Sequence, residues 1–212
     1  MIESRTRLLD AAELLFIERG FAGCSLRAIT AEARVNLAAV NYYFRSKEAL
    51  IREVLLRRLQ PINEERLQLL LAVENAAAGA AVPVQRIVEA FIDPLFSCAH
   101  ATGDTGQLLR RLVGRVHTEP SPCVQRLLVA ECRNVSLRFT AALEKALPDA
   151  SANDIAVRMR FMVGVLVQTA AGLHSEDTAF SAASEAEVVR QMVMFIAAGL
   201  QAPPIARALT SF

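Results

Sequence analysis

The chain has 212 residues, of which 53% are hydrophobic and 21% are charged, while only 9 are glycine and 8 are proline. This composition excludes a disordered chain and favours a helical protein of one large or two small domains. The formal net charge of +1 points to no class of partner, because a protein that reads DNA needs only a local basic surface.

The cysteine spacing and the apolar runs narrow the class of protein further. None of the four cysteines forms a CxxC pair, so we expect reduced thiols, no metal site and no cofactor. The N-terminal residues do not resemble a signal peptide, and the longest apolar runs, residues 161–167 and 192–200, are too short to cross a bilayer. A soluble, cytoplasmic protein with no membrane partner is therefore expected.

Apolar side chains at helical spacing predict a first helix over residues 4–19. Gly20 is expected to end this helix in a left-handed conformation, and Phe21 is expected to fold back onto its last turn. Ser25 is the expected N-cap of a second helix, whose buried stripe includes Ile29.

A third, short helix is expected after a turn at Arg34 and Val35. Asn36 suits its N-cap, and Val40 and Phe44, four residues apart, are expected to face inward. The other side chains of this helix then fall on or near the outer side, namely Leu37, Ala38, Asn41 and Tyr42.

Ser46 is expected to cap a fourth helix, and Pro61 should kink or break that helix before a helical pattern resumes at residues 67–71. An alanine-rich loop follows at residues 75–83. Further helical patterns, separated by breaks rich in Gly, Pro, Ser, Asp or Thr, cover residues 84–100, 107–117, 123–146, 154–173 and 185–200. With no strand-like alternation, the expected fold is all-α, with a three-helix helix-turn-helix domain at residues 1–47 and a larger helical bundle at residues 48–212.

The pattern of residues 25–47 suits a recognition helix that lies in a DNA major groove. Asn41 can pair bidentately with adenine, and the hydroxyls of Tyr42 and Tyr43 can reach phosphates. Lys47 lies in the first turn of a helix, where the dipole already favours an anion. The expected DNA contacts are Ser25, Arg27, Asn36, Leu37, Ala38, Asn41, Tyr42, Tyr43 and Lys47.

Each of these positions also has an ordinary structural explanation. Asn36 can act only as a helix cap, Tyr43 can belong mostly to the core, and Lys47 can be a solvated charge. Only the combination of these residue types at this spacing favours DNA binding.

Residues 7–56 resemble the DNA-binding domain of the TetR family of bacterial transcriptional regulators. The segments that carry the resemblance are LLDAAELLFIERGF, SLRAITAEARV and NYYFRSKEAL. The run NLAAVNYYF is similar to the branch of the family that includes fatty-acid-responsive repressors. The resemblance implies a homodimer with an N-terminal helix-turn-helix and a C-terminal bundle that binds an effector and releases the operator.

Two residues depart from the family pattern. Arg34 stands where the family usually has a glycine in the turn, and a left-handed arginine costs about 1 kcal/mol relative to glycine. Asn41 replaces the first aromatic residue of the recognition helix, which shifts one contact from a phosphate toward a base edge.

The helices expected at residues 154–173 and 185–200 are apolar on most of their circumference. Such a helix is buried on two sides, so that one side can meet its own bundle and the other a second copy of the chain. Two recognition helices about 34–36 Å apart would then read the half-sites of a palindromic operator. The expected dimer interface contains Met159, Met162, Val163, Leu166, Ala170, Val189, Met192 and Ile196, and a thick monomeric core is the alternative.

An apolar cavity between the bundle helices is the expected effector site. Its expected lining is Phe91, Phe96, Arg111, Leu112, Phe139, Phe161 and Val165, although core packing explains most of these positions equally well. Arg111 forms a basic cluster with Arg110, Arg115 and His117, which would suit an acidic amphiphile. The expected effector is therefore small and apolar or amphiphilic, with fatty acids and acyl-CoA among the candidates.

The sequence thus favours a ligand-responsive transcriptional regulator, a repressor, that binds double-stranded DNA. An enzyme is not expected, because the chain has no GxSxG, glycine-rich phosphate loop or HExxH motif. The alternative is a helical carrier of small molecules that no longer binds DNA.

Overall fold

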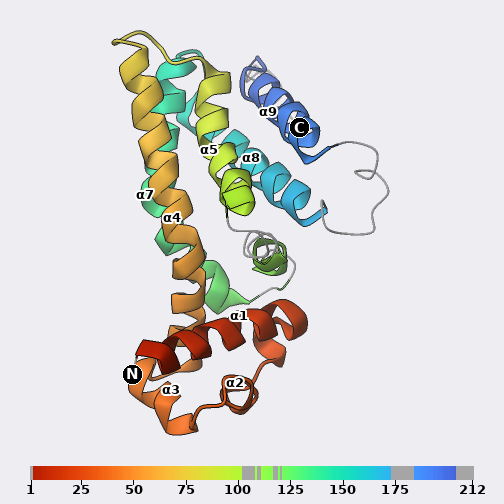
Figure 1. Cartoon of the computed structure of the whole chain (residues 1–212). Coiled ribbons are helices and arrows are strands. Elements are labelled where there is room, and N and C mark those ends of the chain that lie inside the picture. The colour runs from red at the N-terminus through yellow and green to blue at the C-terminus, as the bar shows by residue number, and fades with distance from the viewer. Residues whose placement is uncertain are drawn as a thin grey trace, which may run out of the picture. The chain divides into compact units, whose positions relative to one another are not determined.

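The computed structural model describes residues 2–101, 108, 111–116, 119, 121–172 and 184–203, and the regular structure of these residues is helical (Figure 1). Residues 111–116 are helical. The other helices, in chain order, are α1 (Ile2–Gly23), α2 (Leu26–Glu32), α3 (Leu37–Tyr43), α4 (Lys47–Ala76), α5 (Val84–Ala101), α7 (Pro122–Ala146), α8 (Ala152–Gly172) and α9 (Glu185–Leu200). The predicted all-α fold is confirmed, while the predicted breaks at residues 102–106 and 174–183 lie outside the described residues.

The chain forms two compact units. The first contains Met1–Glu64 and Leu95–Arg133, and the second contains Glu65–Pro94 and Asn134–Phe212. Each unit therefore combines segments that are far apart in the sequence. The predicted division of DNA binding and effector binding at residues 47 and 48 concerns function and stays a prediction.

The first unit contains a large apolar cluster. Helices α1, α2 and α3 pack against one another, and the first turns of α4 add Leu50 and Val54 to their core. Leu112, Val116 and Val124 come from later in the chain and close the same cluster. The two short helices α2 and α3 are thus held by burial, because helices of seven residues are unstable alone.

Helix α4 is continuous through Pro61, so of the two outcomes predicted there, a kink or a break, the break is wrong. Proline removes one backbone donor from the helix. In this position the ring is exposed while the next residue, Ile62, is buried. The loss of one hydrogen bond is small beside the apolar packing along the rest of a 30-residue helix.

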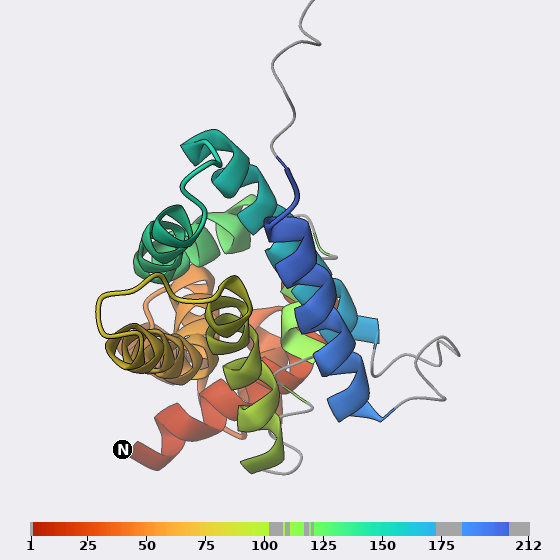
Figure 2. The same cartoon turned by 90° about the horizontal axis from the view of Figure 1, so that it is seen from above.

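In the second unit, α8 packs against α9 (Figures 1 and 2). One face of α8 is buried, and it includes Met159, Met162 and Leu166. By length and mean hydropathy (1.3), Ala152–Gly172 would also qualify as a membrane-spanning helix. The core helix of a helical bundle passes the same test, and one apolar face of α8 is buried in this way, while Val157 and Phe161 are exposed.

Candidate nucleic-acid interface

Helices α2 and α3 begin at the predicted caps. The Ser25 hydroxyl accepts a hydrogen bond from the Ala28 amide at 3.1 Å. Asn36 Oδ1 accepts from the Ala38 amide at 3.0 Å. Both caps satisfy amides that the first turn of a helix leaves without partners, and both predictions are confirmed.

The turn between these helices contains a left-handed arginine. Arg34 has φ = 52°, and its amide donates to the carbonyl oxygen of Ala31 at 3.1 Å. Arg34 therefore adopts the left-handed conformation that glycine favours. This conformation costs about 1 kcal/mol relative to glycine, because the side chain crowds the backbone when φ is positive.

Helix α3 has one buried face and one exposed face, as predicted. Val40 and Phe44 are buried in the core of the first unit. Leu37, Ala38 and Asn41 are exposed. These side chains are therefore available to a partner of the first unit.

The two tyrosines of α3 differ in their environment. Tyr42 is 72% exposed, whereas Tyr43 is half-buried and packs against the apolar cluster. Their rings meet edge to face with centroids 5.0 Å apart. Tyr43 can thus hold the exposed ring of Tyr42 in a restricted position.

Three further predicted DNA contacts lie at helix starts. Ser25 and Arg27 are exposed at the beginning of α2. Lys47 begins α4 and is half-buried, and its ammonium donates to the carbonyl oxygen of Ala22 at 3.5 Å. This long bond leaves the ammonium other donors for a phosphate.

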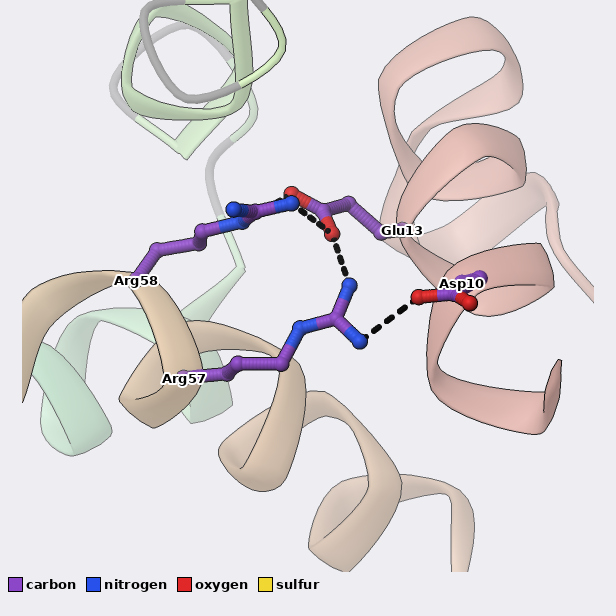
Figure 3. Close-up of polar contacts among 4 residues, drawn as sticks. All are labelled: Asp10, Glu13, Arg57 and Arg58. Atoms are coloured by element: carbon purple, nitrogen blue, oxygen red, sulfur yellow. Dashed lines mark hydrogen bonds and ion pairs between the residues drawn. The ribbon is translucent and has the colours of Figure 1, made fainter. Parts of the chain in front are cut away.

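An ion-pair network joins α1 to α4 (Figure 3). Glu13, which is 1% exposed, accepts hydrogen bonds from Arg57 at 2.5 Å and from Arg58 at 2.7 and 2.9 Å. Arg57 also donates to Asp10 at 2.7 Å. Burial opposes the charge of Arg57, but the bonds to Asp10 and Glu13 outweigh it and raise the pKa of Arg57 above its ordinary value.

A second polar contact fixes the end of α1, and sequence reasoning missed it. Gly20 interrupts the helix with φ = 76° and ψ = 169°. The carboxylate of Glu119 lies over this break and accepts from the amides of Phe21 and Ala22, both at 2.7 Å. The helix resumes after Gly20 and continues to Gly23, so the predicted end at Gly20 is an internal break. Phe21 packs on Phe16, with ring centroids 5.2 Å apart.

Arg115 binds the same break from its other side. Its guanidinium donates to the carbonyl oxygens of Ile17 at 2.9 Å and Glu18 at 3.1 Å. Arg115 therefore binds α1, while Arg110 and His117 of the same predicted cluster lie outside the described residues. No local signal could reveal these contacts, because the partners are 97 or 98 residues apart.

The residues predicted to line an effector cavity belong to both compact units. Leu112 is buried in the apolar cluster of the first unit, and Arg111 is exposed. Phe161 is 66% exposed, which corrects the prediction, because an exposed ring lines no cavity within one chain. Phe96 is buried and Val165 is half-buried.

Two predicted lining residues do meet in the second unit, beside a buried cation. The rings of Phe91 and Phe139 are buried and meet edge to face with centroids 5.0 Å apart. The guanidinium of Arg66 lies 4.1 Å from the Phe91 centroid. Arg66 is 7% exposed, and its Nε donates to the carbonyl oxygen of Phe91 at 2.7 Å.

Most of the predicted dimer residues are buried within a single chain. Six of them are already buried within one chain, so they have almost no surface left for a second copy: Met159, Met162, Leu166, Ala170, Met192 and Ile196. Val163 and Val189 are half-buried. The large apolar side chains that α8 and α9 expose are instead Val157, Phe161, Met194 and Phe195, with exposed fractions of 40%, 66%, 66% and 69%.

Two family models match the chain. Residues 8–54 match the model described as bacterial regulatory proteins, tetR family. Residues 89–199, slightly more than half of the chain, match the model described as Tetracyclin repressor-like, C-terminal domain. The two matches together include α2, α3, the start of α4 and most of the helices that follow it.

Characterised relatives and solved structures agree with these models. The HTH-type transcriptional repressor KstR of Rhodococcus jostii (strain RHA1) is 29% identical over 178 residues, which cover 78% of this chain and 83% of KstR. The HTH-type transcriptional regulator UidR of Escherichia coli (strain K12) is 24% identical over 199 residues, which cover 90% and 91%.

Similarity in structure extends over nearly the whole chain. A tetR family protein from Shewanella sp. PV-4 has a TM-score of 0.66 at 16% identity and covers 91% of this chain and 95% of its own. The regulator PfmR from Thermus thermophilus has a TM-score of 0.60 at 18% identity, with 92% and 98% covered. At these identities the structures establish the shared fold, and the family models establish membership: the chain belongs to the TetR family of bacterial transcriptional regulators and is a DNA-binding helix-turn-helix regulator.

Proposed function

We propose that the protein is a repressor that binds a palindromic operator as a homodimer and is released by a small apolar or amphiphilic effector. The observation that carries the DNA part is the exposed face of α3, where an amide and a phenol stand beside small apolar side chains. Asn41 would read an adenine, and Lys47 would bind a phosphate from the start of α4. Ser25, Arg27, Asn36 and Tyr43 would support these contacts.

A gel-shift titration tests this assignment. The DNA sites come from selection of bound sequences from a random pool. Lys47→Ala should weaken binding to all sequences alike and flatten the salt dependence, because it removes phosphate contacts. Asn41→Ala should instead reduce the preference for the selected site by roughly 1–3 kcal/mol. Full preference in Asn41→Ala would reject α3 as the reading helix, and a wild-type chain that bound no DNA would indicate a carrier function.

The dimer would form through the exposed apolar faces of α8 and α9. Val157 and Phe161 are four residues apart on α8, and Met194 and Phe195 are neighbours on α9. Four such side chains on one two-helix surface would form an isologous four-helix contact with a second copy. Half-buried Val163 and Val189 would lie at its edge.

Sedimentation of a charged variant tests the dimer. Phe161→Asp combined with Phe195→Asp should weaken dimerisation at least about 100-fold, because each ring contributes roughly 2 kcal/mol when buried. Val129→Asp is the matched control, since Val129 is 73% exposed but lies on α7. If the double variant still dimerises and the Val129→Asp control does not, the interface lies elsewhere.

The effector would bind in the second unit beside Phe91 and Phe139. Their apolar rings with the buried cation of Arg66 suit an acidic amphiphile. A panel of saturated fatty acids and their CoA thioesters tests this class. A true ligand should raise the free energy of unfolding by about 2.7 kcal/mol at 100 times its Kd and release the operator. No stabilisation by any member of the panel would reject this effector class.

The effect of the bound effector would be transmitted to α3 through contacts on α1. The Glu13 network ties α1 to α4, and Glu119 and Arg115 hold the break at Gly20. Gly20→Ala would displace the Glu119 carboxylate, because the new Cβ would lie 2.4 Å from Glu119 Oε2. We expect this variant to bind the operator but to respond less to an effector. Unchanged release by the effector would exclude the break at Gly20 from the coupling.

A further inference from the structure

Three residues other than glycine have a positive φ among those described, and two of them are arginines that border α3. Arg34 (φ 52°) precedes the helix, and Arg45 (φ 65°) directly follows its C-cap. The third is Ala78 (φ 48°), in the loop between α4 and α5. Glycine adopts this conformation at a lower free-energy cost than any of the three.

Neither turn uses the arginine side chain. The Arg34 amide donates to the carbonyl oxygen of Ala31 at 3.1 Å, and the Arg45 amide donates to that of Val40 at 3.2 Å. These are backbone contacts that any residue can make, glycine included. Both side chains are exposed, and neither forms an ion pair or a side-chain hydrogen bond with another described residue.

We propose that Arg34 and Arg45 are positioning residues that bind DNA phosphates on the two sides of the major groove that α3 enters. The inference rests on the proposed placement of α3 in that groove. A seven-residue helix is roughly 10 Å long, close to the major-groove width of about 12 Å. Long side chains at its two ends can therefore reach the backbones that flank the groove.

The residue type supports a phosphate more than any other partner. A guanidinium binds phosphate oxygens through two parallel hydrogen bonds and keeps its charge at all relevant pH values. Phosphate contacts fix the register and angle of a recognition helix and carry no sequence information themselves. Strained backbone conformations cluster at functional sites, and two of the three described here lie on either side of the same helix.

Substitution by glycine separates this role from a structural one, because the two predict opposite results. Arg34→Gly and Arg45→Gly should keep or raise the melting temperature of the free protein, since glycine relieves the strain. Each should nevertheless weaken binding to selected and random DNA alike. The expected loss is about fivefold for each phosphate contact removed at 0.15 M salt, and the slope of log Kobs against log salt should flatten by about 0.9 per contact.

The chain supplies a matched control. Ala78→Gly makes the same backbone change away from the helix-turn-helix, so it should leave DNA affinity within twofold of the wild type. Arg34→Lys and Arg45→Lys keep both the charge and the backbone strain, and they should restore most of the affinity and the salt slope. Titrations of all five variants against one selected and one random duplex provide the comparison.

The possible results distinguish the positioning role from a structural one. Loss of affinity with a flatter salt slope in both glycine variants, and not in Ala78→Gly, supports the positioning role. Wild-type affinity in both glycine variants overturns it. If Asn41→Ala still loses its preference for the selected site in that experiment, the proposed role of α3 survives. A uniform loss of affinity in all three glycine variants also overturns the inference. So does wild-type binding in every variant, including Lys47→Ala and Asn41→Ala.

Discussion

Helices α3 and α8 each bury one face and expose another, but the exposed faces differ in chemistry. On α3 the exposed side chains include Asn41 and Tyr42, which carry an amide and a phenol. On α8 they include Val157 and Phe161, which carry no hydrogen-bonding group. Base edges and phosphates require donors and acceptors, whereas a second protein surface excludes water through apolar contact. The exposed face of α3 thus suits nucleic acid, and the exposed face of α8 would suit a second protein surface.

The two helices also differ in what holds them in place. Helix α3 has seven residues, so it depends on its caps and on the packing of α1 and α4 beneath it. Helix α8 has 21 residues, and a continuous buried stripe holds it against α9. The DNA-binding surface should therefore be sensitive to polar contacts, and the α8 surface to apolar volume.

The largest loss of stability is expected where α1 is joined to α4. Glu13→Ala removes the carboxylate that pairs with Arg58 and one of the two that pair with Arg57. We expect a loss of about 3 kcal/mol in the free energy of unfolding, at the low end for a buried pair because both guanidiniums are partly exposed. Chemical denaturation measures this loss. Arg86→Ala, which breaks an exposed pair with Glu89, should cost less than about 1 kcal/mol, and equal losses in both variants would contradict the distinction.

Neighbouring residues of α8 sharpen the comparison between its two faces. Met162 is 2% exposed and Phe161 is 66% exposed. Met162→Ala should lower the stability of a single chain by about 2–3 kcal/mol, because it leaves a cavity. Phe161→Ala should leave the stability of the monomer nearly unchanged and should weaken dimerisation only. The reverse order, measured by denaturation at low protein concentration, would mean that the buried and exposed faces are wrongly assigned.

A smaller effect is expected at the start of α3. Asn36→Ala removes the acceptor for the Ala38 amide and should cost about 1 kcal/mol. Asn36→Asp keeps the acceptor and should retain most of that stability. Thermal denaturation distinguishes the two variants, and an equal loss in both would show that Asn36 does more than cap the helix.

The smallest effect depends on pH and concerns the second unit. Burial raises the pKa of Asp93, and the neighbouring charge of Glu89 raises it further. The folded chain therefore holds this proton more tightly than the unfolded chain, so stability falls as pH rises from the ordinary pKa of 3.8 through the raised value. Asp93→Asn should be slightly more stable than the wild type at pH 7, and this advantage should vanish below pH 3.8. If Asp93→Asn remained more stable than the wild type at low pH, the cause would be packing and not charge.

Local features of the first unit were predictable from the sequence because they depend on residues close together in the chain. Ser25, Asn36 and Ser46 cap helices through amides two or three residues away. Val40 of α3 and its C-cap Phe44 are four residues apart, and the polar residues Asn41 and Tyr42 lie between them, so burial of Val40 and Phe44 leaves the polar side chains outside. That is why the sequence predicted which side of α3 is exposed.

Other features were decided by contacts between distant segments. Helix α8 carries two apolar stripes, so periodicity identified both but could not say which one α9 would cover; the structure buries Met162 and exposes Phe161. The contact of Glu119 with the break at Gly20 has no local signature either. The sequence alone therefore determined the helices, their caps and the outer side of α3, since those follow from short-range hydrogen bonds and one-sided hydrophobicity. Only the tertiary structure decided the free face of α8 and the partners of α1, because burial of an apolar stripe or of a carboxylate depends on which segment arrives from elsewhere in the chain.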